Sequence, residues 1–87
     1  MKYLMWKAGT KYVPVLFPDN MHHRDFKETL EENILELRAA TLVSAGKVRL
    51  DLDGMVICYD YSHGLGIKSD PNDDDIIERS LGYSDTE

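Results

Sequence analysis

Apolar and polar residues alternate along the segment 47–61, with Asp53-Gly54 near its centre. An Asp-Gly pair is typical of a two-residue type I′ turn, in which both central residues have positive φ. A turn there predicts one fully apolar face, made of Val48, Leu50, Leu52, Met55, Ile57 and Tyr59. A one-residue slip moves every side chain to the other face, so we expect the alternation to fix this register. Leu50 then lies in the core, and Leu50→Asp should unfold the protein.

A second hairpin is predicted from residues 2–8 and 11–17, around Gly9-Thr10. Glycine at the first central position indicates a type II′ turn. One face holds Trp6 opposite Val13, Leu4 opposite Val15 and Lys2 opposite Phe17, and the other holds Tyr3, Met5, Tyr12, Pro14 and Leu16. Both faces are partly apolar, so either both are covered or one is a contact surface. Proline lacks the N–H of a ladder, which favours an edge position for the second strand.

Two helices are predicted from spacing and caps. A stripe at helical intervals runs over residues 22–38 and is made of Phe26, Leu30, Ile34 and Leu37, with Asp19 or Asn20 as N-cap and glutamates on a solvated face. Asp70-Pro71 begins a short final helix that has Asp73, Asp74 and Asp75 in its first turn and Ile76, Ile77 and Leu81 as its apolar stripe. Gly82 is suited to its end, and we expect residues 83–87 to fray.

These elements predict a single α+β domain over residues 1–87. Thr41-Leu42-Val43 adds a strand segment before the central hairpin, and Ala45-Gly46 indicates a bulge or bend. The element order is ββαββα or ββαβββα. We expect a mostly antiparallel sheet of two hairpins, packed against one long helix, with the short C-terminal helix at an edge.

Charge and composition narrow the classes of function. The 87 residues carry a net charge of −6, which disfavours nucleic-acid binding through direct basic contacts. Cys58 is the single cysteine, so no internal disulfide forms, and we expect it to be a buried strand residue. No apolar run reaches the roughly 18 residues of a membrane span, and the N-terminal apolar stretch is too short for a secretory signal. We therefore expect a cytoplasmic protein that does not enter membranes.

Histidines offer little organised chemistry in the sequence. His22 and His23 are adjacent and point about 100° apart on a helix, while His63 is distant, so neither a metal nor a cofactor is expected. A small enzyme could be assembled around His63 with Asp60, Tyr59 and Tyr61, or around Cys58 with a histidine, but no spacing places a base beside a nucleophile. Gly64-Leu65-Gly66 precedes an aspartate-rich helix start that would repel a phosphate.

Two surfaces are candidates for binding a protein. The first is acidic and consists of Asp70, Asp73, Asp74 and Asp75, and the second is the apolar hairpin face with Tyr3, Met5, Tyr12 and Leu16. The acidic surface could bind a basic protein, and ordinary solubilising charge is the alternative. The apolar face could bind a partner or form a homodimer.

Several short sequence segments resemble those of a known group of proteins. The segments Val15–Asp19 and Ser44–Val48, the loop Gly64-Leu65-Gly66 and the closing Asp-rich helix resemble small uncharacterised proteins of phages and prophages. The resemblance implies a phage or prophage origin, a bacterial host, and inhibition of host machinery such as defence systems. We expect a non-catalytic protein-binding module, with a self-associating structural protein or a small enzyme centred on His63 as the alternatives.

Overall fold

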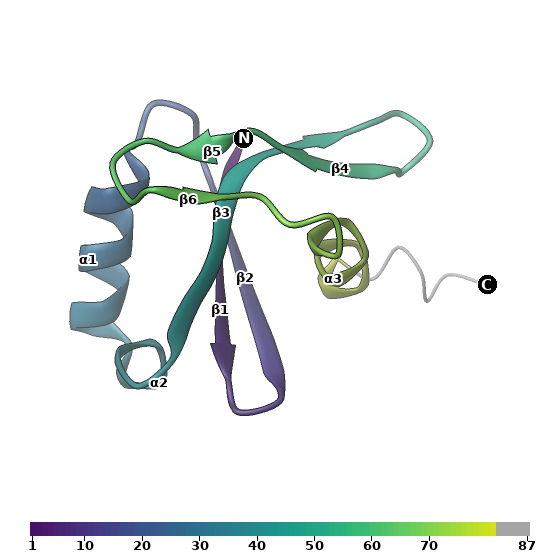
Figure 1. Ribbon diagram of the computed structural model, residues 1–87. Helices are drawn as coiled ribbons and strands as arrows, with labels where there is room; N and C mark the ends of the chain where they lie inside the picture. The colour runs from purple at the N-terminus through teal and green to yellow at the C-terminus, as the bar shows by residue number, and fades with distance from the viewer. Residues whose placement is uncertain (82–87) are drawn as a thin grey trace.

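The computed structural model describes residues 1–81, which form an α+β fold with a mostly antiparallel sheet (Figure 1). Four strands lie in the order β2-β1-β3-β4, and β5 and β6 pair separately. The elements are β1 (Lys2–Ala8), β2 (Lys11–Phe17), α1 (His23–Asn33), α2 (Leu35–Arg38), β3 (Thr41–Leu50), β4 (Val56–Tyr59), β5 (Tyr61–Ser62), β6 (Ile67–Lys68) and α3 (Asp73–Ser80). The predicted α+β class with a mostly antiparallel sheet is confirmed, whereas the predicted element order lacks α2 and the β5–β6 pair, and α3 covers a face of the sheet instead of an edge.

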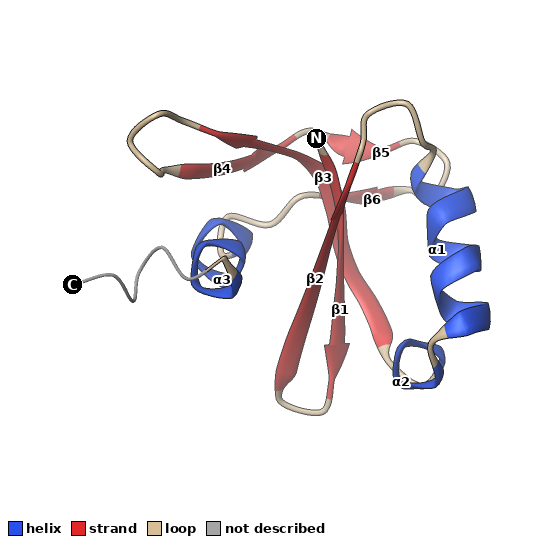
Figure 2. Cartoon of the chain, turned by 180° about the vertical axis from the view of Figure 1, so that it is seen from behind, coloured by secondary structure: helices blue, strands red, loops and turns tan. Residues whose placement is uncertain are grey.

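Helices cover both faces of the sheet (Figure 2). The face toward α1 and α2 buries a cluster that comprises Leu4, Trp6, Phe17, Leu37 and Ala45. The face toward α3 buries a second cluster that comprises Tyr3, Met5, Val48, Val56 and Ile77. Side chains alternate along a strand, so β1 contributes buried residues to both clusters. The N-terminal hairpin is therefore covered on both faces. Of the two alternatives predicted for it, coverage on both sides is the one that the structure has.

The N-terminal hairpin has the predicted register. Trp6 pairs with Val13 and Leu4 with Val15, and Gly9 has a φ of 64°, the positive value that a type II′ turn needs at its first central residue. Pro14 lies in β2, an edge strand of the sheet. Both predictions for this hairpin are confirmed.

The register predicted for the central hairpin is wrong by one residue. Leu50 pairs with Val56, not with Ile57. The Gly54 N–H donates to the Asp51 carbonyl at 2.9 Å, and in this turn only Gly54 has a positive φ, of 82°. This is a three-residue loop, in which a type I turn is followed by a glycine in the left-handed conformation. The extra loop residue exchanges the two faces of β4 relative to β3.

The shifted register changes which β4 side chains share the core face of Val48, namely Val56 and Cys58 in place of Ile57 and Tyr59. Leu50 lies on the same face as Val48 but is 40% exposed, because this end of the hairpin projects beyond α3. The predicted apolar face is therefore divided, and its exposed members are Leu50, Leu52, Met55 and Tyr59. The prediction that Leu50 anchors the core is wrong.

The predicted long helix is interrupted. Ile34 is extended (φ −123°, ψ 107°) and separates α1 from α2, so its side chain is 41% exposed instead of completing the stripe. The Arg38 guanidinium donates to the carbonyls of Glu31 and Glu32, so these groups at the end of α1 have hydrogen-bond partners despite the interruption. The short second helix turns Leu37 onto the sheet. The N-cap is His22, not Asp19 or Asn20.

Strand β3 runs without a gap through the segment where a bend was expected. Its irregularity lies at Val43, because Met5 pairs with Ser44 and Trp6 with Leu42. Gly46 instead marks a close approach: a Cβ there would lie 2.5 Å from the Tyr59 carbonyl oxygen.

The final helix starts with reciprocal hydrogen bonds. The Asp70 carboxylate accepts from the Asn72 N–H at 2.9 Å, and the Asp73 carboxylate accepts from the Asp70 N–H at 3.1 Å. These bonds close a turn before α3, whose N-cap is Asn72, so the prediction that Asp70 caps the helix and Pro71 begins it is wrong: Pro71 and Asn72 form a turn ahead of Asp73, the first helical residue. Ile77 is buried on the sheet, and Leu81 is exposed. The predictions for Gly82 and for residues 83–87 lie outside the described residues.

Candidate functional site

The acidic residues of the last helix divide into two exposed and two internal carboxylates. Asp70 and Asp75 are exposed. Asp73 is 3% exposed and accepts a 2.5 Å hydrogen bond from the Tyr3 hydroxyl. Asp74 accepts from the Cys58 N–H at 2.7 Å. The four aspartates therefore do not form one continuous acidic surface, because two of them hold α3 on the sheet.

The internal carboxylates also change the groups that they contact. Burial raises the pKa of the Tyr3 hydroxyl, and the hydrogen bond to Asp73 raises it further. Burial and the neighbouring Asp74 raise the pKa of the Cys58 thiol to about 12. Cys58 is therefore a protonated, unreactive thiol at neutral pH, which disfavours it as a nucleophile.

The predicted apolar hairpin face is mostly internal. Tyr3 and Met5 are fully buried under α3, and Leu16 is half-buried against the same cluster. Tyr12 alone is exposed, and the Lys7 ammonium lies 5.5 Å from its ring centroid. In this fold the face forms part of the core, and only Tyr12 offers substantial area to a partner.

Both edges of the four-stranded sheet carry protection against strand addition. Pro14 removes a donor from β2, and the Asp74 carboxylate occupies the Cys58 N–H on β4. Edge strands with free backbone groups recruit other chains, and these two features block that mode. A partner must then be contacted mainly through side chains.

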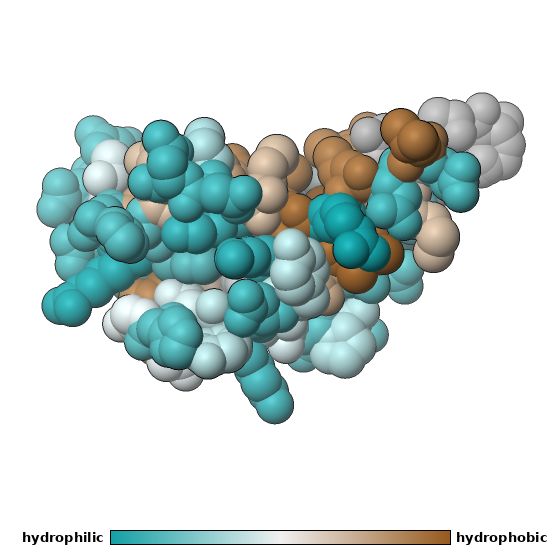
Figure 3. Space-filling view, turned by 90° about the horizontal axis from the view of Figure 1, so that it is seen from above, coloured by the Kyte–Doolittle hydropathy of each residue, from teal (hydrophilic) through white to brown (hydrophobic). Residues whose placement is uncertain are grey.

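Apolar side chains gather at the end of the β3–β4 hairpin, which projects beyond α3 (Figure 1). We call Leu50, Leu52 and Met55 the hairpin tip. Leu52 is fully exposed and Met55 is 57% exposed. Figure 3 shows hydrophobic surface at this end, while much of the remaining view is hydrophilic. The sequence pattern predicts these residues on the apolar core face, and they are exposed because this end of the hairpin extends beyond the helix that covers the sheet.

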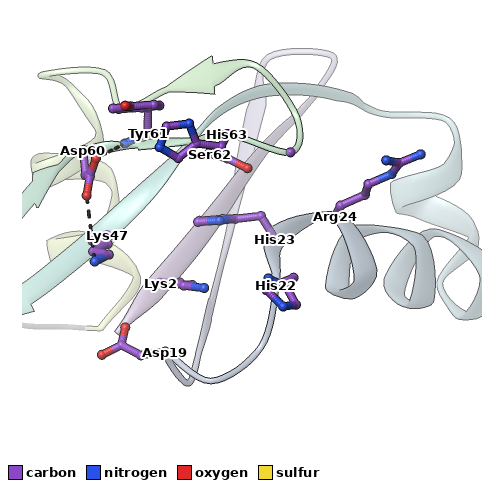
Figure 4. Close-up of a pocket in the computed structure, with 11 residues that line it drawn as sticks. Lys2, Asp19, His22, His23, Arg24, Lys47, Asp60, Tyr61, Ser62 and His63 are labelled. Carbon is purple, nitrogen blue, oxygen red and sulfur yellow. Dashed lines mark hydrogen bonds and ion pairs between the residues drawn. The ribbon is translucent and has the colours of Figure 1, made fainter.

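A pocket of about 490 Å³ lies between the start of α1 and the β5–β6 hairpin (Figure 4). It brings His63 together with His22 and His23, which lie 41 and 40 positions earlier in the sequence. We call it the histidine pocket, and its lining residues are Lys2, Asp19, His22, His23, Arg24, Lys47, Asp60, Tyr61, Ser62, His63 and Gly64.

His23 forms the buried wall of the histidine pocket. Its Nε2 lies 2.8 Å from the Gly46 carbonyl oxygen, so Nε2 carries the hydrogen and donates it. Its ring meets Phe17 edge-on, with centroids 5.3 Å apart. Burial lowers the pKa of His23, the hydrogen bond to Gly46 raises it, and the nearby Lys2 ammonium lowers it again. The net lowering keeps the imidazole neutral at pH 7.

Asp60 turns the chain from β4 into β5 at the pocket. It has a φ of 68°, a left-handed value that aspartate tolerates better than most residues. One carboxylate oxygen accepts from the Tyr61 N–H at 2.9 Å, and the other lies 3.8 Å from the Lys47 ammonium. The His63 ring stacks edge-on against Tyr61, at 4.4 Å between centroids. The Asp60 carboxylate is thus directed to Lys47 and the Tyr61 amide instead of to His63.

This geometry does not assemble the acid–base pair considered from the sequence. Asp60 and His63 both line the pocket, but Asp60 contacts Lys47 and the Tyr61 amide, whereas His63 contacts the Tyr61 ring. Among residues 1–81, no group of three or more His, Cys, Asp or Glu side chains is placed to hold a metal ion. The pocket is organised around cationic and imidazole groups, which are suited to binding.

Comparisons of the chain with protein-family models, curated proteins and solved structures found no match. Within the described part of the chain, no helix has the length and apolar character to cross a membrane. The function must therefore be inferred from the surfaces of the molecule itself.

Proposed function

We propose that the protein is a small non-catalytic protein-binding module that contacts its partner through the hairpin tip. The observation that carries this proposal is the complete exposure of Leu52 beside Met55 and Leu50. Exposed single apolar residues are ordinary, but a group at the end of a projecting hairpin is typical of interaction sites.

The energetics favour binding at this position. Burying one Leu or Met side chain contributes about 1.5–3 kcal/mol, so a partner pocket that takes Leu52 and Met55 gains a substantial part of a micromolar affinity. Arg49 and Asp51 form an ion pair at 3.3 Å beside the tip. An apolar centre with a charged rim is the usual arrangement of a protein interface.

Inhibition of a host complex is the form of this function that the resemblance to phage proteins suggests. A projecting apolar hairpin supports it, because such a tip can enter a groove of a larger protein with little change in the rest of the module. The phage origin and the host target stay predictions.

Site-directed photo-cross-linking tests the proposal. A photoreactive phenylalanine analogue at position 52 is compared with the same residue at position 35, where Leu35 is also exposed, by 74%. We expect a defined cross-linked protein from a lysate of the source cells at position 52 and much less at position 35. The same product should disappear when Met55→Ser is added to the position-52 protein.

Equal cross-linking from positions 52 and 35 would contradict the assignment of the tip. A product of twice the monomer mass from purified protein would show self-association, and the partner would then be a second copy. Sedimentation of the Leu52→Ser variant distinguishes these outcomes, since a tip-mediated dimer should dissociate in that variant.

A further inference from the structure

The histidine pocket carries positive charge in an otherwise acidic chain. The whole sequence has 10 Lys and Arg against 16 Asp and Glu. The pocket lining has three cations, Lys2, Arg24 and Lys47, against two carboxylates, Asp19 and Asp60. Cations therefore outnumber carboxylates in the lining of this pocket, which is the opposite of the balance in the whole sequence.

Two of these cations are paired with carboxylates, Lys47 with Asp60 at 3.8 Å and Arg24 with Glu28 at 3.7 Å, so the charge that remains for a ligand is that of Lys2. Both oxygens of Asp60 are engaged, by Lys47 and by the Tyr61 N–H. The Asp19 side chain is 68% exposed at the rim, where water screens it. The Lys2 ammonium donates to the Met21 carbonyl at 2.8 Å, and among residues 1–81 no carboxylate lies within ion-pair distance of it.

The start of α1 adds donors at the same wall. Helix α1 has 11 residues, and its N-cap His22 makes no side-chain hydrogen bond to the first turn. The first N–H groups of a helix lack partners within the helix and carry partial positive charge. Ser62, which is 2% exposed, brings a hydroxyl group to the opposite wall. Figure 4 shows these groups around one hollow, with Lys2 and His22 below His23.

We propose that the histidine pocket binds the phosphate group of a small molecule, held by Lys2, His22 and the backbone amides at the start of α1. An ammonium, an imidazole and helix amides can all donate hydrogen bonds to phosphate oxygens. The volume of about 490 Å³ falls in the range of pockets that hold small organic ligands, so there is room for the part of the molecule attached to the phosphate. The Tyr61–His63 ring pair offers that part an apolar surface. The site is separate from the hairpin tip and does not depend on it.

NMR titration of the ¹⁵N-labelled full chain tests this site. The probes are inorganic phosphate, adenosine monophosphate, adenosine and acetate. We expect saturable shifts of the Arg24, Ser62 and Gly64 amides with the two phosphates, and none with adenosine or acetate over the same range. Tighter binding of the monophosphate than of phosphate indicates a phosphorylated small molecule, and equal binding indicates the free anion; both support the proposal.

Matched variants separate local contact from overall charge. Lys2→Met should weaken phosphate binding about tenfold, the loss expected for one charge-assisted contact. Lys11→Met makes the same charge change at the far end of the β1–β2 hairpin and should alter affinity less than about twofold. Arg24→Gln is a second control, because its guanidinium pairs with Glu28 at 3.7 Å and points away from Lys2 and His22 in Figure 4, so this variant should also alter affinity less than about twofold.

Linear, non-saturating shifts with every anion would overturn the proposal, as would equal affinity in Lys2→Met, Arg24→Gln and Lys11→Met. Leu52→Ser should bind phosphate as the natural chain does. Loss of partner cross-linking and loss of phosphate binding are therefore distinguishable failures.

Discussion

The Tyr3 hydroxyl donates a 2.5 Å hydrogen bond to the Asp73 carboxylate, which joins the first strand to the last helix across 70 positions of sequence. Both residues are buried, and the same carboxylate oxygen accepts from the Asp70 N–H. One buried acid therefore closes the start of α3 and fixes that helix on the sheet. Its role is structural, although its sequence context suggested a solvent-exposed acidic surface.

Removal of this hydroxyl should destabilise the fold measurably. Tyr3→Phe leaves the buried Asp73 without one donor, and we expect a loss of about 1–3 kcal/mol in the free energy of unfolding. Urea denaturation followed by circular dichroism measures it. Tyr12→Phe is the control, because Tyr12 is 42% exposed, and it should change stability by less than about 0.5 kcal/mol. Equal effects of the two variants would show that the bond contributes nothing specific.

The projection of the central hairpin beyond α3 gives unequal effects at two positions on the same face of β3. Val48 is 2% exposed and Leu50 is 40% exposed. Val48→Asp places an unpaired charge in the core and should cost about 4 kcal/mol or more, which unfolds a domain of this size. Leu50→Asp should cost only about 1 kcal/mol. Thermal melts of the two variants test whether Leu50 lies in the core, as the sequence pattern predicts, or beyond it, and unfolding of Leu50→Asp would contradict its exposed position.

The two hairpins show why one register followed from sequence and the other did not. At Gly9-Thr10, glycine occupies the first central position, where type II′ needs positive φ, so turn chemistry and hydrophobic pattern agree. At Asp53-Gly54, glycine satisfies a two-residue and a three-residue loop equally well. The alternation of apolar and polar residues could not decide between the two loop lengths, because Val56 and Cys58 on the opposite face of the strand are also apolar. Packing against Ile77 selects the longer loop.

The break at Ile34 has no local signal either, since the segment contains neither glycine nor proline. The 3.6-residue period of Phe26, Leu30 and Ile34 predicts an unbroken helix. The break turns Leu37 onto the sheet, where it is 3% exposed, and tertiary packing overrides helical propensity. The sequence pattern within one element predicted the type of that element here, but it did not predict where one element ends and the next begins.

The histidine pocket depends on contacts that are distant in sequence. The sequence showed His22 and His23 at a helix start and His63 in a loop. Their approach requires the left-handed corner at Asp60, which folds β5 and β6 back toward α1. An Asp-Tyr pair after a strand does not predict such a corner, because aspartate also occurs at ordinary extended positions.

Gly46 allows that corner to approach β3, so a methyl group there should disturb both stability and the pocket. In Gly46→Ala the Cβ would meet the carbonyl oxygens of Tyr59 and Asp60 at 2.5 and 3.2 Å. We expect a loss of about 2 kcal/mol or more, with shifted amide resonances for residues 60–64. Gly64→Ala is the control: the nearest atom is the Arg24 Cβ at 3.7 Å, an ordinary contact, so stability should change by less than about 0.5 kcal/mol. A neutral Gly46→Ala would mean that the corner does not lie against β3.

Protonation of His23 should oppose folding at mildly acidic pH. Burial lowers the pKa of His23 below its ordinary value of 6.5, so between these two pKa values the unfolded chain binds more protons than the folded one. Stability then rises with pH through this window, and it is lost as the pH falls below about 6.5. Urea midpoints at pH 7.5 and 5.5 measure the change.

The variant His23→Gln should flatten this dependence, since its amide can still donate to the Gly46 carbonyl but does not titrate in this range. Val15→Ala is the matched control. Val15 packs against the core cluster that contains Phe17, the ring in contact with His23, so its truncation weakens this cluster without removing a titratable group. It should lower the urea midpoints at both pH values and preserve their difference. An unchanged difference in His23→Gln would assign the pH dependence to another group and leave the buried imidazole with a purely packing role.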